Sequence, residues 1–403
     1  LTTRSFPGIT FPPQIKKRSR YLTHVSRAQK AWFSDDDDDE GTMVTMMRAI
    51  AFSAFCDAGR KSKRGVFVFF KGNRGASTST STSTSSSPRS PNATPTTPNA
   101  TKGEVGKKKP LKLLSWNVNG LRSTITNRPS FLADLENATN GFDVLALQET
   151  KLQESHAMKL KADAEEWTKN AQFEEVVFSC SKARKGYSGV ALILANPRVK
   201  VLKTIEGFHE KCLDVVEFEK TEENVAAFEL FNREGRLVTW ALETAVVINA
   251  YVPNSGEGLK RLRERIEVWE PAMKAHVECV KKEMKNKPIV WLGDFNVAHE
   301  KNDLWGNWTQ NESSAGFTPQ ERRAFSKQLE DLRLTDSFRY KHPTAKDTFT
   351  YWSYRAKSRD RNRGWRIDYA LVSEEHKEDI RDAFVVSTFT GSDHCPLGVE
   401  IDA

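Results

Sequence analysis

The chain has 403 residues, of which 38% are hydrophobic, so it is long enough to form a large folded core. It contains no run of about 18 apolar residues, which argues against a membrane-spanning helix. Its five cysteines are odd in number and form no C-x-x-C pair, which argues against a disulfide framework and against a zinc site.

The formal net charge of +8 is distributed unevenly along the chain. Residues 1–110 contain 19 Lys and Arg against 8 Asp and Glu, a net charge of +11, whereas the remaining residues contain 42 against 45, a net charge of −3. The body of the protein can therefore bind nucleic acid only through basic residues that are gathered on one face.

Residues 1–109 are predicted to be a disordered, low-complexity extension, because an acidic run (Asp35 to Glu40) and an unbroken Ser/Thr tract (Ser77 to Ser87) offer little apolar surface to bury. The stretch from Met43 to Phe70 fits an organelle-targeting peptide with its start at Met43, and it fits a featureless tail equally well. The cluster Lys107 to Lys109 fits nuclear import or contact with nucleic acid. We expect a nuclear protein, with the mitochondrion or plastid as alternatives.

Residues 110–403 are predicted to be a single α/β domain, because short apolar runs alternate with helical patterns. The apolar runs read as buried strands, and they are Leu111–Leu114, Val144–Leu147, Val190–Leu194, Ala245–Tyr251, Ile289–Leu292, Ile367–Val372 and Pro396–Ile401.

Two helices are predicted from their spacing and end signals. Leu259 to Met284 carries an apolar stripe, and Pro271 should kink this helix or split it in two. A second helix should begin after Thr318, with Pro319 in its first turn and Glu321 completing a capping box.

Polar residues of one chemical kind follow the predicted strands. They are Asn117 and Asn119 after the first strand, Gln148 and Glu149 after the second, Asp294 and Asn296 after Ile289–Leu292, and Asp393 and His394 before the last strand. Carboxylate and amide oxygens suit Mg²⁺, and a single imidazole suits a proton donor or an electrophile better than a zinc ligand. Any one of these residues alone has an ordinary explanation as a turn or surface residue, whereas the ordered set indicates a metal-assisted site.

The segments Gly293–Asn296 and Ser392–Pro396 resemble the signatures of the endonuclease/exonuclease/phosphatase superfamily. Six further stretches are similar to exonuclease III-type apurinic/apyrimidinic endonucleases, and the resemblance runs from Leu111 to the end: Ser115–Arg122, Leu147–Lys151, Gly186–Val190, Tyr251–Asn254, Ala315–Arg322 and Gly364–Tyr369.

The resemblance implies a four-layered α/β sandwich with two central mixed β-sheets, as in DNase I. It implies an enzyme of base-excision repair that hydrolyses the phosphodiester 5′ to an abasic site in double-stranded DNA, with 3′→5′ exonuclease and 3′-phosphodiesterase as accompanying activities. The implied cofactor is Mg²⁺, with Mn²⁺ as a substitute. We expect a monomer that interacts with other base-excision repair proteins. We expect no association with a membrane.

The resemblance also implies roles for matching positions. Glu149 would be the main metal ligand, in a set completed by Asn117, Asn119, Asp294, Asn296, Asp393 and His394. Asp294 would orient or deprotonate the attacking water, and His394, held by Asp368, would contact the scissile phosphate. Tyr251, Asn254 and Asn296 would bind the same phosphate.

Substrate contacts are predicted at Tyr351, Trp365, Tyr187, Arg261 and Arg355. Tyr351 and Trp365 would form the pocket for the extrahelical sugar, and Trp352 fits the pocket and the ordinary core equally well. Five of the six basic residues between Arg355 and Arg366 would line a loop that faces DNA, although a solvated loop explains any one of them.

Three of the chain's departures from the family's pattern bear on metal binding, DNA contact or the fold. Asn119 stands where many animal members have Asp, which should weaken metal binding, and Glu257 stands where some relatives place an Arg in the DNA. Residues 211–234 look longer than in relatives, and we interpret them as a hairpin or loop insertion.

Two other functions stay open on the sequence alone. One is another phosphodiesterase of the superfamily, such as a deadenylase or a phosphoinositide phosphatase. The other is a catalytically silent DNA-binding scaffold. The balance of endonuclease and exonuclease activity and the number of metals do not follow from the sequence.

Overall fold

The computed structural model describes residues 109–163, 168, 173–285 and 287–403. The extension predicted at 1–109, apart from Lys109, and the targeting segment from Met43 to Phe70 lie outside the described residues. The domain boundary at 109/110 therefore stays a prediction.

Two six-stranded mixed sheets form the centre of the domain. The first sheet has the strand order β11-β12-β1-β2-β4-β3, and the second has the order β5-β6-β7-β8-β10-β9. Each sheet has a parallel pair at its centre, β1 with β2 and β7 with β8, and its other neighbouring strands are antiparallel. The carboxyl ends of each parallel pair therefore reach the same edge of their sheet.

Seven of the strands agree closely with the apolar runs of the sequence, and the other five, β3, β5, β6, β9 and β11, were not predicted. The first sheet contains β1 (Leu111–Asn117), β2 (Val144–Gln148), β3 (Glu175–Ser179), β4 (Val190–Leu194), β11 (Ile380–Val385) and β12 (Leu397–Ile401). The second contains β5 (Val201–Glu206), β6 (Leu237–Leu242), β7 (Val246–Tyr251), β8 (Ile289–Asp294), β9 (Leu334–Asp336) and β10 (Asp368–Ser373).

The two sheets pack face to face over one apolar cluster. Leu113 and Leu192 of the first sheet lie in the same buried cluster as Trp240, Leu292 and Val372 of the second. Strands with this packing on one face and helices on the other are buried on both faces, which explains why they read as continuous apolar runs. The prediction of seven buried strands is confirmed for this reason.

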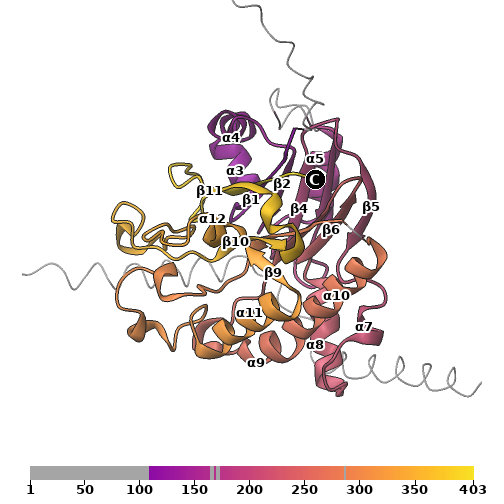
Figure 1. The fold of residues 1–403 in the computed structure, drawn as a ribbon, viewed down its shortest axis with the longest axis vertical. Helices are drawn as coiled ribbons and strands as arrows, with labels where there is room; N and C mark the ends of the chain where they lie inside the picture. The colour runs from indigo at the N-terminus through magenta and orange to yellow at the C-terminus, as the bar shows by residue number, and fades with distance from the viewer. Residues whose placement is uncertain (1–108, 164–167, 169–172, 286) are drawn as a thin grey trace, which may run out of the picture. The chain divides into compact units, whose positions relative to one another are not determined.

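Helices cover the outer faces of both sheets, so the domain has four layers, and the predicted sandwich is confirmed (Figure 1). The helices are α3 (Leu121–Asn127), α4 (Phe131–Thr139) and α5 (Glu154–Ala162) beside the first sheet, and α7 (Cys212–Val215), α8 (Glu222–Arg233), α9 (Leu262–Glu264), α10 (Glu270–Glu283), α11 (Pro319–Asp331) and α12 (Ser337–Lys341) later in the chain. No helix among the described residues is long and apolar enough to cross a membrane.

Both helix predictions hold in outline. The backbone stays helical through a π-helical turn at Arg265–Trp269 into α10, and Pro271 lies in the first turn of α10. The kink or split at Pro271 stays a prediction. The helical region begins at Leu262, because Leu259 has a left-handed backbone (φ 59°). Thr318 and Glu321 form the predicted capping box at the start of α11.

The interpretation of residues 211–234 as a hairpin or loop is wrong. The segment contains α7 and α8, and Thr221 caps α8 by accepting a hydrogen bond from the Asn224 amide. Phe228 and Phe231 of α8 are buried in the cluster that includes Trp269. The two phenylalanines lie at helical spacing, but the many charged residues elsewhere in 211–234 obscured this pattern.

Candidate active site

The two parallel strand pairs deliver the predicted site residues to one place. Asn117 ends β1 and is paired in register with Gln148 at the end of β2. Tyr251 ends β7 and is paired in register with Asp294 at the end of β8. Side chains that follow these four strand ends therefore converge, which is the arrangement predicted from the sequence.

Three residues of the site hold a left-handed backbone that side chains other than glycine seldom adopt. They are Asn119 (φ 49°), Glu149 (φ 50°) and Asn296 (φ 48°), and each follows a central strand directly or by one residue. Strain of this kind costs about 1–3 kcal/mol per residue and is found mostly where function requires a fixed side chain. The backbone thus turns these three side chains toward the site.

Asn117 joins the two halves of the site. Its side-chain nitrogen donates to Glu149 Oε1 and to Asp294 Oδ2, both at 2.9 Å, and it is fully buried. Gln148 points instead into the layer between the sheets, where it donates to Asn249 Oδ1 at 2.8 Å. Gln148 is therefore structural, and Glu149 is the residue that β2 supplies to the site.

A cation already lies among the predicted metal ligands. The Lys151 ammonium is 3.0 Å from Glu149 Oε2 and also donates to Asn119 Oδ1. Burial raises the pKa of Glu149, but the charge of Lys151 and hydrogen bonds from Asn117 and Lys151 outweigh burial, and the pKa is lowered. Asn119 in turn donates to Asp393 Oδ1 at 2.9 Å. This set of anionic and amide oxygens fits a hard divalent cation.

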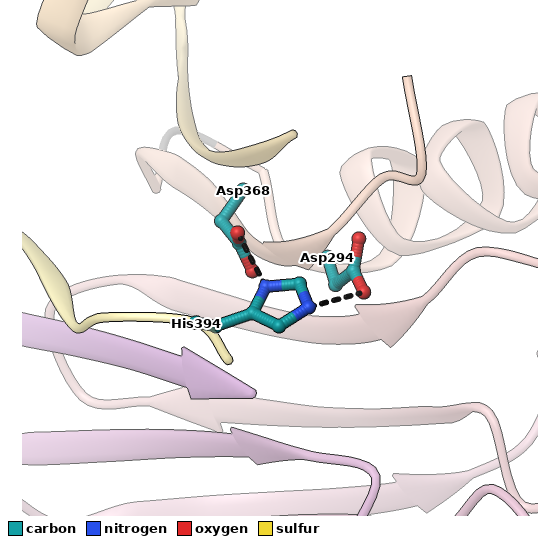
Figure 2. A group of neighbouring side chains, drawn as sticks. All are labelled: Asp294, Asp368 and His394. Atoms are coloured by element: carbon teal, nitrogen blue, oxygen red, sulfur yellow. Dashed lines mark hydrogen bonds and ion pairs between the residues drawn. The ribbon is translucent and has the colours of Figure 1, made fainter. Parts of the chain in front are cut away.

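Asp294, His394 and Asp368 form a buried line in which each imidazole nitrogen faces a carboxylate (Figure 2). His394 Nδ1 is 2.8 Å from Asp368 Oδ2, and Nε2 is 3.9 Å from Asp294 Oδ2. Burial lowers the pKa of His394, but the two carboxylates raise it well above the ordinary value. Burial, followed by the charge of Asp368, raises the pKa of Asp294.

The same three residues lie close enough together to hold a metal ion. An imidazole that is protonated at both nitrogens, however, has no lone pair to offer a metal. The oxygens around Glu149 are the better metal ligands, and His394 is better suited to donate hydrogen bonds.

Asn254 and Asn296 lie beside Asp294. Asn254 donates from Nδ2 to Asn296 Oδ1 at 2.7 Å, and the Asn296 amide donates to Asp294 Oδ1 at 2.8 Å. Tyr251 lies between Glu149 and the buried Arg236, whose guanidinium carbon is 4.8 Å from the tyrosine ring centroid. Burial and the charge of Glu149 raise the pKa of Tyr251, so its hydroxyl is a donor at neutral pH.

The predicted pocket residues Tyr351 and Trp365 are brought to the site. Tyr351 pairs by isolated bridges with Trp365 and His394, and its ring centroid is 4.9 Å from that of His394. Trp352 is buried against Phe349 and Cys395, so it belongs to the core.

Tyr187 and Arg261 are connected to Tyr251 through Arg236, which lies over the rings of both tyrosines. The Tyr187 hydroxyl accepts hydrogen bonds from Arg236 at 2.6 Å and from Arg261 at 3.1 Å. Arg261 also pairs with Glu234 at 3.2 Å. These contacts hold a cationic cluster at the rim of the site.

The basic run near the pocket divides into exposed and internal residues. Arg355 is exposed on a 3-10 helix. Arg366 is buried and pairs with Asp303 and Asp336, both at 2.8 Å, so it cannot reach DNA. Arg359 donates to the carbonyl groups of Ser387, Phe389 and Ser392 and is also structural. At most four of the six basic residues can therefore face DNA, so the prediction of five was too high.

Three residues of the site were missed by the sequence analysis. Lys151 pairs with Glu149, Arg236 lies over the ring of Tyr251, and Tyr354 is 72% exposed with its hydroxyl near Asn119 and Asp393. Lys151 lies inside a motif that was noted, so its position two residues after Glu149 was an available signal.

Comparison with known proteins agrees with this geometry. Residues 114–394 match the profile of the Endonuclease/Exonuclease/phosphatase family. The chain belongs to this family. An exodeoxyribonuclease of Bacillus subtilis is 36% identical over 292 residues, which cover 72% of this chain and 100% of that protein. A DNA-(apurinic or apyrimidinic site) endonuclease of Dictyostelium discoideum is 33% identical over 298 residues, with 72% of this chain and 71% of that protein covered.

The solved structures give the same result for the fold. An AP endonuclease from Leishmania major superposes with a TM-score of 0.61 at 29% identity, covering 73% of this chain and 88% of that chain. The resemblance to exonuclease III-type enzymes that the motifs indicated is confirmed, and this family member is a phosphodiester-hydrolysing enzyme.

Proposed function

We propose that this nuclease is a Mg²⁺-dependent endonuclease that hydrolyses the phosphodiester 5′ to an abasic site in double-stranded DNA. The observation that carries the proposal is the buried Asp294–His394–Asp368 line, joined through Asn117 to the oxygens around Glu149. It places a base, a phosphate-binding imidazolium and a metal site within one hydrogen-bonded set.

The hydrolysis needs a water in line with the leaving oxygen. Asp294 is the group that takes the proton of this water, because its raised pKa makes it a better base than an ordinary aspartate. His394 donates to a phosphate oxygen, and Asp368 fixes the orientation of its ring. Asn254 and the Tyr251 hydroxyl add donors that require no rearrangement during the reaction.

Glu149, with Asn119 and Asp393, would hold Mg²⁺. When bound, Mg²⁺ acts as a Lewis acid that stabilises charge on the phosphate and on the leaving oxygen. Lys151 competes for the same oxygens, so it would have to move aside or share Glu149 with the metal.

The choice of an abasic substrate is supported by the aromatic wall of Tyr351 and Trp365 beside His394. A nucleotide without a base leaves the helix cheaply, because it has no base to unstack. The relatives named as abasic-site endonucleases in Dictyostelium and Leishmania support the same substrate.

The test is incision of a labelled duplex with one abasic site, compared with an intact duplex, poly(A) and inositol polyphosphates. We expect incision at the abasic position of the damaged duplex, requiring Mg²⁺ and abolished by EDTA, and no internal incision of the intact duplex. Asp294→Asn should lower turnover by a factor of about 10²–10⁴, and Glu149→Ala should raise the Mg²⁺ concentration required. Preference for poly(A) or inositol phosphates, or near-normal turnover of Asp294→Asn, would contradict the proposal.

A further inference from the structure

Two tryptophans on the segment that follows Glu300 each lie beside a cation. The Arg363 guanidinium carbon is 4.4 Å from the Trp305 ring centroid, and Lys301 Nζ is 3.9 Å from that of Trp308. Trp305 is 44% exposed, and Lys301 and Arg363 are also exposed. These four residues are called the tryptophan patch below. An exposed aromatic surface that is edged by cations can mark a binding site.

The tryptophan patch continues the aromatic wall of the site. Trp308 packs in one cluster with Trp365 and Tyr351. The Trp305 amide donates to the Gly364 carbonyl at 2.9 Å, and Leu304 forms an isolated bridge with Trp365. A strand whose abasic sugar lies against Tyr351 and Trp365 would therefore have neighbouring nucleotides within reach of the patch.

The base of the patch is held rigidly. Asp303 is fully buried and accepts hydrogen bonds from Arg366 at 2.8 Å and from Arg339 at 2.6 Å. Its carbonyl accepts from the Arg366 amide at 2.7 Å. A ligand that binds here pays little entropy to order the protein, because the loop is already fixed.

An exposed indole beside a cation suits an unpaired nucleotide. Bases in a duplex have their faces covered by the stack, whereas an unpaired base offers a face to an aromatic ring and a phosphate to the neighbouring cation. The buried Asp303 is paired with Arg366 and Arg339, and the exposed Glu300 faces Arg339 at 3.9 Å. The charge of Glu300 is thereby partly balanced, and the patch keeps a positive character.

We propose that the tryptophan patch is a stacking site for unpaired nucleotides of single-stranded DNA next to the active site. The proposal rests on the proposed function for the identification of the ligand as a DNA strand. The binding of that strand by the patch does not depend on the catalytic activity. It predicts that the enzyme recognises single-stranded or frayed DNA beside the lesion through Trp305, in addition to the duplex.

The test measures binding without catalysis. Fluorescence anisotropy in EDTA gives the dissociation constants for a labelled single-stranded oligothymidylate and for a blunt duplex of equal length. Trp305→Ala should weaken single-strand binding about tenfold, and the loss on the duplex should be several times smaller. Trp305→Phe should recover most of the single-strand affinity, and Arg363→Ala should lower it severalfold. Tyr340→Ala removes an aromatic ring that is 37% exposed on α12 and serves as the matched control.

An equal loss on both DNAs, or no loss on either, would overturn the stacking site. Because Trp305 is exposed, Trp305→Ala should fold normally, and an unchanged melting temperature checks this. Incision of the abasic duplex is measured separately. Failure of incision with retained Trp305-dependent single-strand binding would refute the proposed function alone, and the converse result would refute the patch alone.

Discussion

Asn117 holds two carboxylates of the site with one amide nitrogen, since that nitrogen carries two hydrogens. A carboxylate in its place would donate to neither Glu149 nor Asp294 and would repel both. We expect Asn117→Asp to lower turnover on an abasic duplex about 100-fold or more, as removal of one positioned donor commonly does. Asn127→Asp, at an exposed amide that donates to Ser123, is the control. Turnover near the wild-type value would contradict this role.

The charge of Asp368 acts on both of its neighbours in the site. After burial, it is the largest influence that raises the pKa of Asp294, and it also raises the pKa of His394. Activity that needs Asp294 deprotonated and His394 protonated rises with pH through the first pKa and falls through the second. Replacing Asp368 lowers both pKa values, so both limbs should move to lower pH.

The measurement is kcat/KM for Asp368→Asn across acidic to alkaline pH at saturating Mg²⁺. We expect the profile to shift downward by about one pH unit or more, in line with the loss of one nearby charge. Asp379→Asn breaks a partly exposed pair with His376 of the same 2.8 Å length and should leave the profile unchanged. A lower kcat/KM at every pH with unchanged apparent pKa values would show that Asp368 only orients the imidazole of His394.

Three loops of the site are joined by one buried ion pair between the π-helical turn and α11. Arg265 donates to the carbonyl groups of Phe295 and Asn296 at 2.7 and 2.8 Å, and it pairs with Glu321 at 3.1 Å. Glu321 also accepts from Ser255 Oγ at 2.5 Å and from the Gly316 amide at 2.8 Å. The pair therefore ties together the loops after β7 and β8 and the start of α11.

Removing the charge of Glu321 should be costly, because the buried Arg265 would keep only the more distant Glu270, at 3.5 Å, as an ionic partner. We expect Glu321→Gln to lower the free energy of unfolding by about 3 kcal/mol, measured by urea denaturation. Glu330→Gln, at an exposed position of the same helix, should change it by less than about 0.5 kcal/mol. Equal effects of the two substitutions would show that the pair contributes little.

At the scale of elements, the sequence predicted the features that depend on residues close together in the chain. Strands buried on both faces and the Thr318 capping box were visible as patterns in the sequence. Asn117, Glu149 and Asp294 could be placed together because each ends or follows a predicted strand, and the ends of these strands meet at one edge. The burial of Trp352 and Arg366 was not predictable, because it depends on partners such as Cys395 and Asp303 that are distant in sequence. The helical insertion was missed because charged residues hid its apolar face.

At the scale of the whole molecule, the net positive charge lies outside the catalytic domain. Residues 1–108 carry 18 Lys and Arg against 8 Asp and Glu. Each phosphate contact adds about 0.9 to the slope of log affinity against log salt concentration. We expect removal of residues 1–108 to weaken binding to undamaged duplex and to flatten this slope, measured by anisotropy over a salt series. An unchanged slope would exclude the extension from DNA contact.

The last strand of the first sheet has a consequence for the order in which the enzyme becomes active. β12 (Leu397–Ile401) lies between β11 and β1 and is paired along its length with the strand that opens the domain. A chain that is still being synthesised carries Glu149 and Asp294 long before it carries β12 and His394. The first sheet then has an open edge at β1, and the site has no imidazole. We therefore expect a chain that terminates before His394 to have no nuclease activity.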